Sequence, residues 1–158
     1  MGVVLKPALK HAILVIGERS PPIAKQAVLV VDDEAPVRAT LTRFLKLLGV
    51  DEVLEATNGQ EAVEQLKASP QVRLVLLDLK MPERDGVQAL TEMKAINPLV
   101  KIVILTGYPF YKEADQAAQT LGAFDFLVKP VDLDYLERIV TLTLDQDHSP
   151  PPSPTITS

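Results

Sequence analysis

Short, continuous runs of apolar residues recur through the middle of the chain, and amphipathic stretches separate them. The runs are rich in Val, Leu and Ile and cover residues 27–31, 53–54, 72–77, 100–105 and 123–128. Continuous apolar runs, rather than alternating ones, are typical of strands that are covered on both faces. Five such strands alternating with helices predict an α/β fold with a parallel sheet and right-handed crossovers.

The stretches between the runs have the spacing of amphipathic helices. Apolar residues fall on one stripe in residues 38–48, 60–68, 87–96 and 132–144. Residues suited to helix ends flank these stretches, with Asn58 and Asp132 as candidate N-caps and Gly49 and Gly122 as candidate closing residues.

Both ends of the chain differ from this middle part. Residues 1–26 contain three prolines around one short apolar run and match no motif, so they form an N-terminal extension of unknown role. Residues 146–158 are rich in Pro and Ser, which predicts a disordered or polyproline-like tail. We therefore expect a single domain over residues 27–145 of the 158.

Charge and composition exclude several classes of function. A net charge of −5 argues against a broad surface for direct nucleic-acid binding, which needs Lys and Arg to neutralise phosphates. No apolar run approaches the ~20 residues that cross a bilayer, so no membrane association is expected. Cysteine is absent, which rules out thiolate metal sites and suits a reducing compartment; we expect a soluble cytoplasmic protein.

Chemically reactive side chains follow four of the five predicted strands. Asp32 and Asp33 follow the first, Asp78 the third, Thr106 the fourth and Lys129 the fifth. Each residue alone has an ordinary alternative, such as an N-cap for Asp33 or a turn residue for Asp78. Because the carboxyl ends of parallel strands share one edge of the sheet, the set instead predicts a single cleft.

The sequence resembles the receiver domain of two-component response regulators. The motifs that carry the resemblance are VLVVDDE at 28–34, LLDLKMPERDG at 76–86, LTG at 105–107 and GAFDFLVKP at 122–130. The resemblance implies a flavodoxin-like (CheY-like) doubly wound sheet of order 2-1-3-4-5, with helices on both faces.

The resemblance implies that Asp78 is the phosphoacceptor of a magnesium-dependent switch. Asp33 and Asp78 would ligate Mg²⁺ directly, Asp32 mainly through water, and the backbone carbonyl of Lys80 would be a further ligand. Three adjacent carboxylates repel one another unless a cation intervenes, and Mg²⁺ prefers such oxygen ligands. Lys129 would add a second positive charge at the phosphoryl oxygens.

Further positions of the family pattern concern the readout of phosphorylation. Thr106 would donate a hydrogen bond to the phosphoryl group, and Phe126 would move into the space that Thr106 leaves; burial of Phe126 in the core is the alternative. Lys80 and Tyr108 would limit access of water, so we expect a long-lived phosphoryl state. Lys129-Pro130 would be a cis peptide.

The resemblance also implies partners. The donor would be a phosphohistidine on a sensor histidine kinase or a phosphotransfer protein. The output protein would contact the surface that the family forms from its fourth helix, fifth strand and fifth helix, and a homodimer could use the same surface. The last stretch of this chain, residues 132–144, corresponds to the fifth helix of the family. In the last helix, Leu133, Leu136 and Val140 are expected to face inward, and Tyr135, Ile139 and Leu142 outward on that surface, unless those three are buried in the core.

The sequence is compatible with three functions of the whole protein. A stand-alone receiver acts by protein contact, catalysing only its own phosphoryl transfer and slow autodephosphorylation, and so is not an enzyme with turnover. A second account is a truncated receiver of a larger DNA-binding or enzymatic response regulator. The third, a phosphatase of haloacid-dehalogenase type, fits least, because such enzymes place their DxD nucleophile after the first strand and carry a substrate cap.

Overall fold

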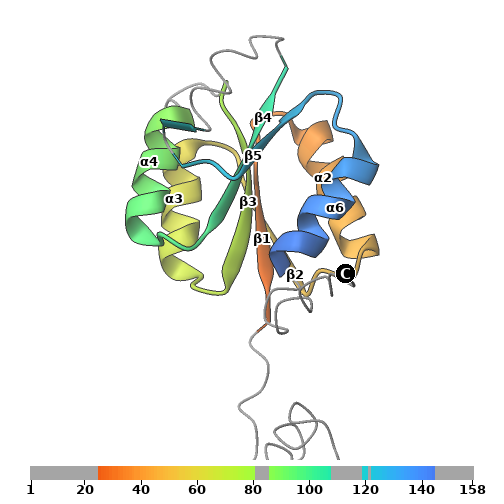
Figure 1. Ribbon diagram of the computed structural model, residues 1–158, viewed down its shortest axis with the longest axis horizontal. Helices are drawn as coiled ribbons and strands as arrows, with labels where there is room; N and C mark the ends of the chain where they lie inside the picture. The colour runs from red at the N-terminus through yellow and green to blue at the C-terminus, as the bar shows by residue number, and fades with distance from the viewer. Residues whose placement is uncertain (1–24, 81–85, 108–118, 121, 145–158) are drawn as a thin grey trace, which may run out of the picture.

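The computed structural model describes residues 25–80, 86–107, 119–120 and 122–144. Within them, five parallel strands form one sheet in the order β2-β1-β3-β4-β5, which confirms the predicted doubly wound α/β topology (Figure 1). The strands are β1 (Ala27–Val31), β2 (Glu52–Ala56), β3 (Val72–Asp78), β4 (Lys101–Thr106) and β5 (Asp125–Val128).

Helices cover both faces of this sheet. The described helices are α2 (Ala35–Leu47), α3 (Gly59–Ala68), α4 (Gly86–Ile96) and α6 (Leu133–Leu144). Figure 1 shows α3 and α4 on one face and α2 and α6 on the other. None of these helices combines the length and apolar character that crossing a membrane needs.

The continuous apolar strands supply two cores at once. In β1, Ala27, Leu29 and Val31 pack on the α3–α4 side, and Val28 and Val30 pack on the α2–α6 side. All five residues are fully buried, because successive side chains of a strand point to opposite faces and each face carries a helical layer. This two-sided burial fixes the positions of the strand ends.

The predicted helix ends are confirmed where the structure describes them. Asn58 Oδ1 accepts a hydrogen bond from the Glu61 N–H at 2.8 Å, and Asp132 Oδ1 accepts from the N–H groups of Asp134 and Tyr135. Gly49 has a φ of 89°, a left-handed conformation that favours glycine after a helix. The N-cap of α2 is Glu34, not Asp33, so the capping alternative for Asp33 is wrong.

The predicted faces of α6 need correction at two residues. Ile139 was expected on the outer face but is only 2% exposed, because with Leu136, Val140 and Thr143 it forms the i, i+3, i+4, i+7 stripe against the sheet. Leu133 was expected inside but is 37% exposed at the first position of the helix. Tyr135 and Leu142 are exposed, as predicted.

The two terminal segments cannot be compared with their predictions. Residues 1–24 and 145–158 lie outside the described residues, as do 81–85 and 108–118. The predicted extension and tail therefore stay predictions.

Candidate functional site

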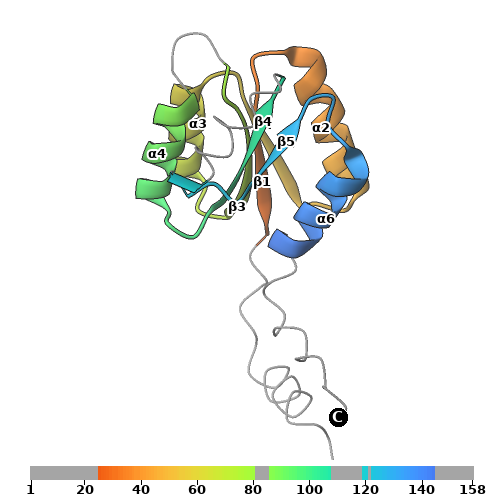
Figure 2. The ribbon, with the colours of Figure 1, turned by 45° about the horizontal axis from the view of Figure 1, so that its top comes forward.

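The register of the sheet brings the four predicted strand ends to one edge. Val31 of β1 pairs with Leu77 of β3, so Asp32 and Asp78 follow neighbouring positions. Asp78 in turn pairs with Leu105 of β4, and Thr106 pairs with Val128 of β5. Figure 2 brings this edge toward the viewer, between the two helical layers.

The carboxylates of Asp32, Asp33 and Asp78 form one cluster. A ligand oxygen from each lies within 4.8 Å of the other two. Asp32 and Asp78 are buried, and Asp33 is exposed and forms the open side. Burial raises the pKa of Asp78, and the nearby Asp32 charge adds to this, against hydrogen bonds and charge from Lys80 and Lys129. Crowded, partly desolvated carboxylates of this kind fit a hard divalent cation.

Lys129 reaches into the same cluster from the end of β5. Its Nζ lies 2.7 Å from Asp32 Oδ2, 3.3 Å from Asp78 Oδ2 and 3.8 Å from Glu34 Oε1. Burial alone would lower the pKa of Lys129, but its close contact with the Asp32 carboxylate and the charges of Asp78 and Asp32 outweigh burial and raise that pKa. Lys129 therefore carries a positive charge at the carboxylates.

The hydrogen-bonding capacity of the buried Asp32 Oδ2 is not satisfied within this cluster. Among the described residues no hydrogen bond with acceptable geometry reaches this buried oxygen, and its close contact is the Lys129 ammonium. A buried carboxylate oxygen in this position is stabilised by a further cation or by water. The donor set and this oxygen together fit Mg²⁺.

The backbone on either side of the cluster is held by local hydrogen bonds. Lys129 N–H donates to the Thr106 carbonyl at 2.7 Å, and the Lys129-Pro130 peptide is cis, as predicted. Lys80 N–H donates to Asp78 Oδ1 at 3.0 Å, and the Lys80 side chain is exposed. The Asp78 carboxylate thus accepts hydrogen bonds both from the loop that follows it and from the Lys129 ammonium.

Gly86 lies against the loop that follows Asp78. A Cβ atom at Gly86 would lie 2.7 Å from Leu79 Cα and 2.8 Å from the Asp78 carbonyl oxygen. Only glycine permits such a close approach of two backbone segments. Gly86 therefore holds the position of the Asp78–Leu79 backbone from the start of α4.

The two proposed readout residues lie on neighbouring strands, two register positions apart, since Phe126 pairs with Ile104 and Thr106 pairs with Val128. Thr106 is half-buried at the end of β4. Phe126 in β5 is also half-buried and packs against the α3–α4 core. Both readings of Phe126, switch and core, are compatible with this position, and Tyr108 lies outside the described residues.

Sequence reasoning missed two charged residues beside the cluster. Arg38 Nη1 donates to the Asp32 carbonyl at 2.7 Å, and its Nε lies 3.7 Å from Glu55 Oε1. Glu34 donates its N–H to Asp32 Oδ1 at 2.9 Å. Glu34 could have been found as the third acid of the DDE motif, whereas Arg38 carries no sequence signal because it folds back from α2.

Comparisons with known proteins agree with this geometry. The family model described as the response regulator receiver domain matches residues 28–141. The transcriptional regulatory protein ZraR of Escherichia coli K12 is 38% identical over 122 residues, which cover 77% of this chain and 27% of ZraR. This chain therefore spans about a quarter of the length of such curated relatives.

Two shorter relatives match over nearly their whole length. The chemotaxis protein CheY of Bacillus subtilis is 38% identical over 75% of this chain and 97% of its own. This chain is also similar to a chain in a co-crystal structure from Saccharomyces cerevisiae. That structure contains the histidine phosphotransfer signaling protein Ypd1 and the receiver domain of its downstream response regulator Ssk1. It matches with a TM-score of 0.69 and 29% identity, over 78% of this chain and 91% of that one.

Proposed function

This chain belongs to the response regulator receiver domain family, and we propose that it accepts a phosphoryl group on Asp78 and thereby switches a protein-interaction surface. The observation that carries the proposal is the Asp32, Asp33 and Asp78 carboxylate cluster with the Lys129 ammonium 3.3 Å from Asp78. This arrangement combines an anionic nucleophile with the positive charge that a phosphoryl group needs.

The residues suited to hold Mg²⁺ are Asp32, Asp33 and Asp78, with the Lys80 carbonyl as a further candidate ligand. Bound Mg²⁺ neutralises charge on the phosphoryl oxygens. The burial of Asp32 and Asp78 keeps these carboxylates in fixed positions, and the exposure of Asp33 leaves a path for the ion from solvent.

Asp78 and Lys129 have different roles in the phosphoryl transfer. An Asp78 carboxylate oxygen forms a bond to phosphorus as the bond from phosphorus to the donor imidazole nitrogen breaks. The transition state is loose, so positioning and charge neutralisation matter most. Lys129 supplies a point charge to the phosphoryl oxygens, and the Lys80 N–H fixes the orientation of the attacking carboxylate.

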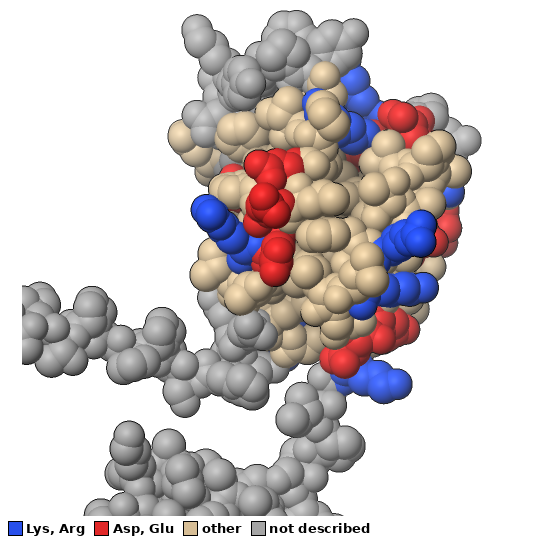
Figure 3. Space-filling view, turned by 90° about the vertical axis from the view of Figure 1, so that its right-hand side faces the viewer, with Lys and Arg blue, Asp and Glu red and all other residues tan. Residues whose placement is uncertain are grey.

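The donor in this proposal is a phosphohistidine on a sensor histidine kinase or a phosphotransfer protein. Support comes from the likeness to the Ssk1 receiver domain that was crystallised with Ypd1. An apolar groove of about 310 Å³ begins at Lys129 and is lined by Pro36, Val37, Val131 and Leu133 among others. On the side that carries α2 and α6, charged side chains surround a large uncharged area (Figure 3). A helical donor could bury apolar residues in this groove while its histidine reaches Asp78.

Phosphorylation would be read out through Thr106 and Phe126. The phosphoryl oxygens accept a hydrogen bond from the Thr106 hydroxyl, and Phe126 turns inward behind it. The output surface would include β5 and the exposed Tyr135 and Leu142 of α6, without the buried Ile139.

The Phe126→Ala variant tests this readout. We expect phosphorylation to persist while binding of the output partner, or dimerisation, is lost. Equal loss of phosphorylation and binding would show that Phe126 is only a core residue.

Lys80 and Tyr108 belong to the proposal as modulators of the phosphoryl lifetime. A long Lys and a bulky Tyr beside the acceptor would screen it from water, so that autodephosphorylation is slow. A Lys80→Asn/Tyr108→Glu double variant should lose the phosphoryl group faster than the wild type, and an unchanged rate would contradict the role.

The extent of the whole protein is also part of the proposal. We take residues 27–145 as the receiver domain, 1–26 as an extension and 146–158 as a Pro/Ser-rich tail, acting in the cytoplasm. Since the chain spans 27% of ZraR, a receiver of a longer DNA-binding or enzymatic regulator is the second candidate.

Transfer from a phosphorylated donor tests the proposed function. A phosphotransfer protein carrying labelled phosphohistidine should pass its label to this chain with Mg²⁺ until each molecule carries one phosphoryl group. Free phosphate should then appear slowly. Continuous release of phosphate over many turnovers would point to a phosphatase instead, and no transfer at all would contradict the proposal.

A further inference from the structure

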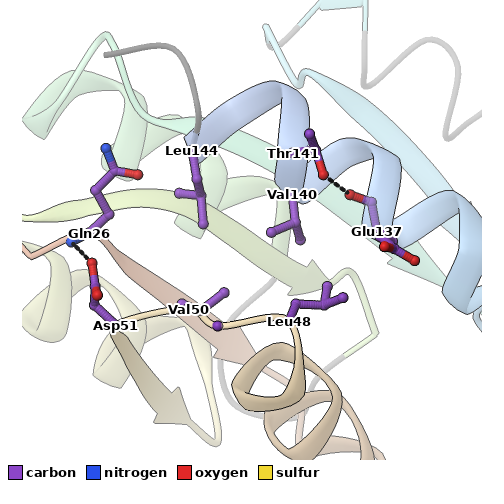
Figure 4. Close-up of a pocket in the computed structure, with 9 residues that line it drawn as sticks. Gln26, Leu48, Val50, Asp51, Glu137, Val140, Thr141 and Leu144 are labelled. Carbon is purple, nitrogen blue, oxygen red and sulfur yellow. Dashed lines mark hydrogen bonds between the residues drawn. The ribbon is translucent and has the colours of Figure 1, made fainter. Parts of the chain in front are cut away.

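A second hollow lies at the opposite edge of the sheet from Asp78. It has a volume of about 270 Å³ and forms where β1 begins and α6 ends, with Gln26 and Leu144 in its lining. Figure 4 shows Val140 and Leu144 of α6 pointing toward Leu48 and Val50 across the hollow. Aliphatic side chains from two separate parts of the chain therefore face each other across its middle, and polar groups make up the larger part of its lining.

The two ends of this hollow are acidic. Asp51 lies beside Gln26 at one end, where its Oδ2 accepts the Gln26 N–H at 3.1 Å, and Glu137 lies at the other end (Figure 4). Both acidic side chains are exposed. The hollow thus offers an aliphatic centre between two negative charges, which suits a segment with apolar residues between or beside basic ones.

The volume of the hollow restricts what can occupy it. Small-molecule sites usually enclose roughly 300–1,000 Å³, so this hollow is at or below the lower limit of that class. It is the size for a few side chains of a peptide rather than for a nucleotide or another cofactor.

We propose that residues 6–16 of this same chain dock in this hollow. Their sequence, KPALKHAILVI, carries Lys6 and Lys10 and no acidic residue, followed by a run of aliphatic residues. The other segment near this edge, residues 145–158, opens with Asp145 and Asp147, which have the same charge as Asp51 and Glu137. Charge complementarity therefore selects the N-terminal segment.

The covalent connection favours the same occupant. Residue 26 lines the hollow, and residues 17–25 join it to the proposed segment with a reach of up to about 30 Å. A segment tethered this closely has an effective concentration on the order of millimolar, so weak contacts suffice to hold it. The proposal is independent of the phosphoryl chemistry at the other edge.

Paramagnetic broadening in the full-length chain tests the proposal. The chain has no cysteine, so Lys46→Cys gives one nitroxide site on α2, two residues before Leu48 and outside the lining of the hollow. In isotope-labelled protein, the amide signals of residues 6–16 should lose intensity relative to the reduced, diamagnetic sample. Signals of those residues that keep full intensity would overturn the proposal.

Charge reversal supplies the matched comparison. Asp51→Lys with Glu137→Lys should restore the intensity of the 6–16 signals, and so should about 1 M salt, which shortens the screening length to ~3 Å. Glu64→Lys with Asp134→Lys makes the same change in net charge elsewhere and should leave the broadening in place. Equal effects of both pairs would overturn the proposal.

Two competing occupants give their own results in the same experiment. Broadening of residues 145–158 in place of 6–16 would assign the hollow to the C-terminal segment. Broadening between isotope-labelled and spin-labelled molecules in a mixed sample would assign it to a second copy of the chain. Either result would overturn the proposal.

Discussion

At the scale of single residues, the site depends on a balance of charge that the sequence suggests only in part. The order of acids, hydroxyl and amine predicts which side chains meet, because strand ends in a parallel sheet share an edge. It does not predict that Lys129 lies closer to Asp32 than to Asp78, at 2.7 Å against 3.3 Å. That preference depends on side-chain packing beyond the strand ends, as does the position of Arg38.

Gly86 gives a prediction at this scale. Replacing Gly86 with Ala places a methyl group 2.7 Å from Leu79 Cα, so the backbone beside Asp78 must shift. We expect a loss of about 1–3 kcal/mol in the free energy of unfolding, as for other overpacked sites. Phosphorylation of Asp78 should also slow. Urea unfolding and the rate of labelling by acetyl phosphate measure the two effects.

Gly107→Ala is the matched control for Gly86→Ala. It adds the same methyl group where no atom lies within 4 Å, so stability should hardly change. Equal stability of the two variants would show that the close approach at Gly86 is not required.

At the scale of elements, periodicity predicts the helices well and their faces less well. The stripe of α3 is confirmed in full, since Ala62, Val63 and Leu66 are all buried. In α6 the same reasoning placed Ile139 outside and Leu133 inside. Two apolar stripes compete on that helix, and only the position of the sheet decides which of them is buried.

The start of α3 gives a prediction about pH. The Thr57 hydroxyl and the Thr57 N–H both donate hydrogen bonds to the Glu61 carboxylate. These bonds, the hydroxyl's being the larger effect, lower the pKa of Glu61 from its ordinary value of 4.5. A lowered pKa in the folded state stabilises the protein above the ordinary pKa, and this stabilisation is lost as the pH falls through the lowered value. Because Glu61 is largely solvated, the effect should be at most roughly 0.5 kcal/mol.

Glu61→Gln tests this effect by chemical denaturation. The variant should be less stable than the wild type at pH 7, and the difference should shrink toward pH 3. Glu64→Gln, on an exposed position of the same helix, should show no such trend. A difference for Glu61→Gln that stays constant across this range would contradict the role of the charge.

At the scale of the whole molecule, the fold and the position of the site can be predicted from the sequence, whereas the shapes of the surface hollows cannot. Continuous Val, Leu and Ile runs predict a sheet covered on both faces, and the structure confirms the strand order and both helical layers. The groove at Lys129 and the hollow at Gln26 each combine distant segments. Their shapes depend on how loops pack, which periodicity does not encode.

Magnesium should stabilise the whole fold through the carboxylate cluster. A ligand at 100 times its Kd adds about 2.7 kcal/mol to the free energy of unfolding, so Tm should rise by several degrees with Mg²⁺. Asp33→Asn should remove most of this rise, since Asp33 belongs to the cluster, and a chelator should reverse the rise in the wild type. Asp51→Asn, at the opposite edge, should keep the rise. A rise of equal size in Asp33→Asn would place the ion elsewhere.

The most direct test of the account is the intact mass of the protein after incubation with acetyl phosphate and Mg²⁺. The wild type should gain the mass of one phosphoryl group, and Asp78→Asn, which keeps the shape of the side chain without its charge, should gain none. Omitting Mg²⁺ should suppress the gain in the wild type. A wild type without added mass, or an Asp78→Asn variant that gains it equally, would contradict the assignment of Asp78 as the phosphoacceptor.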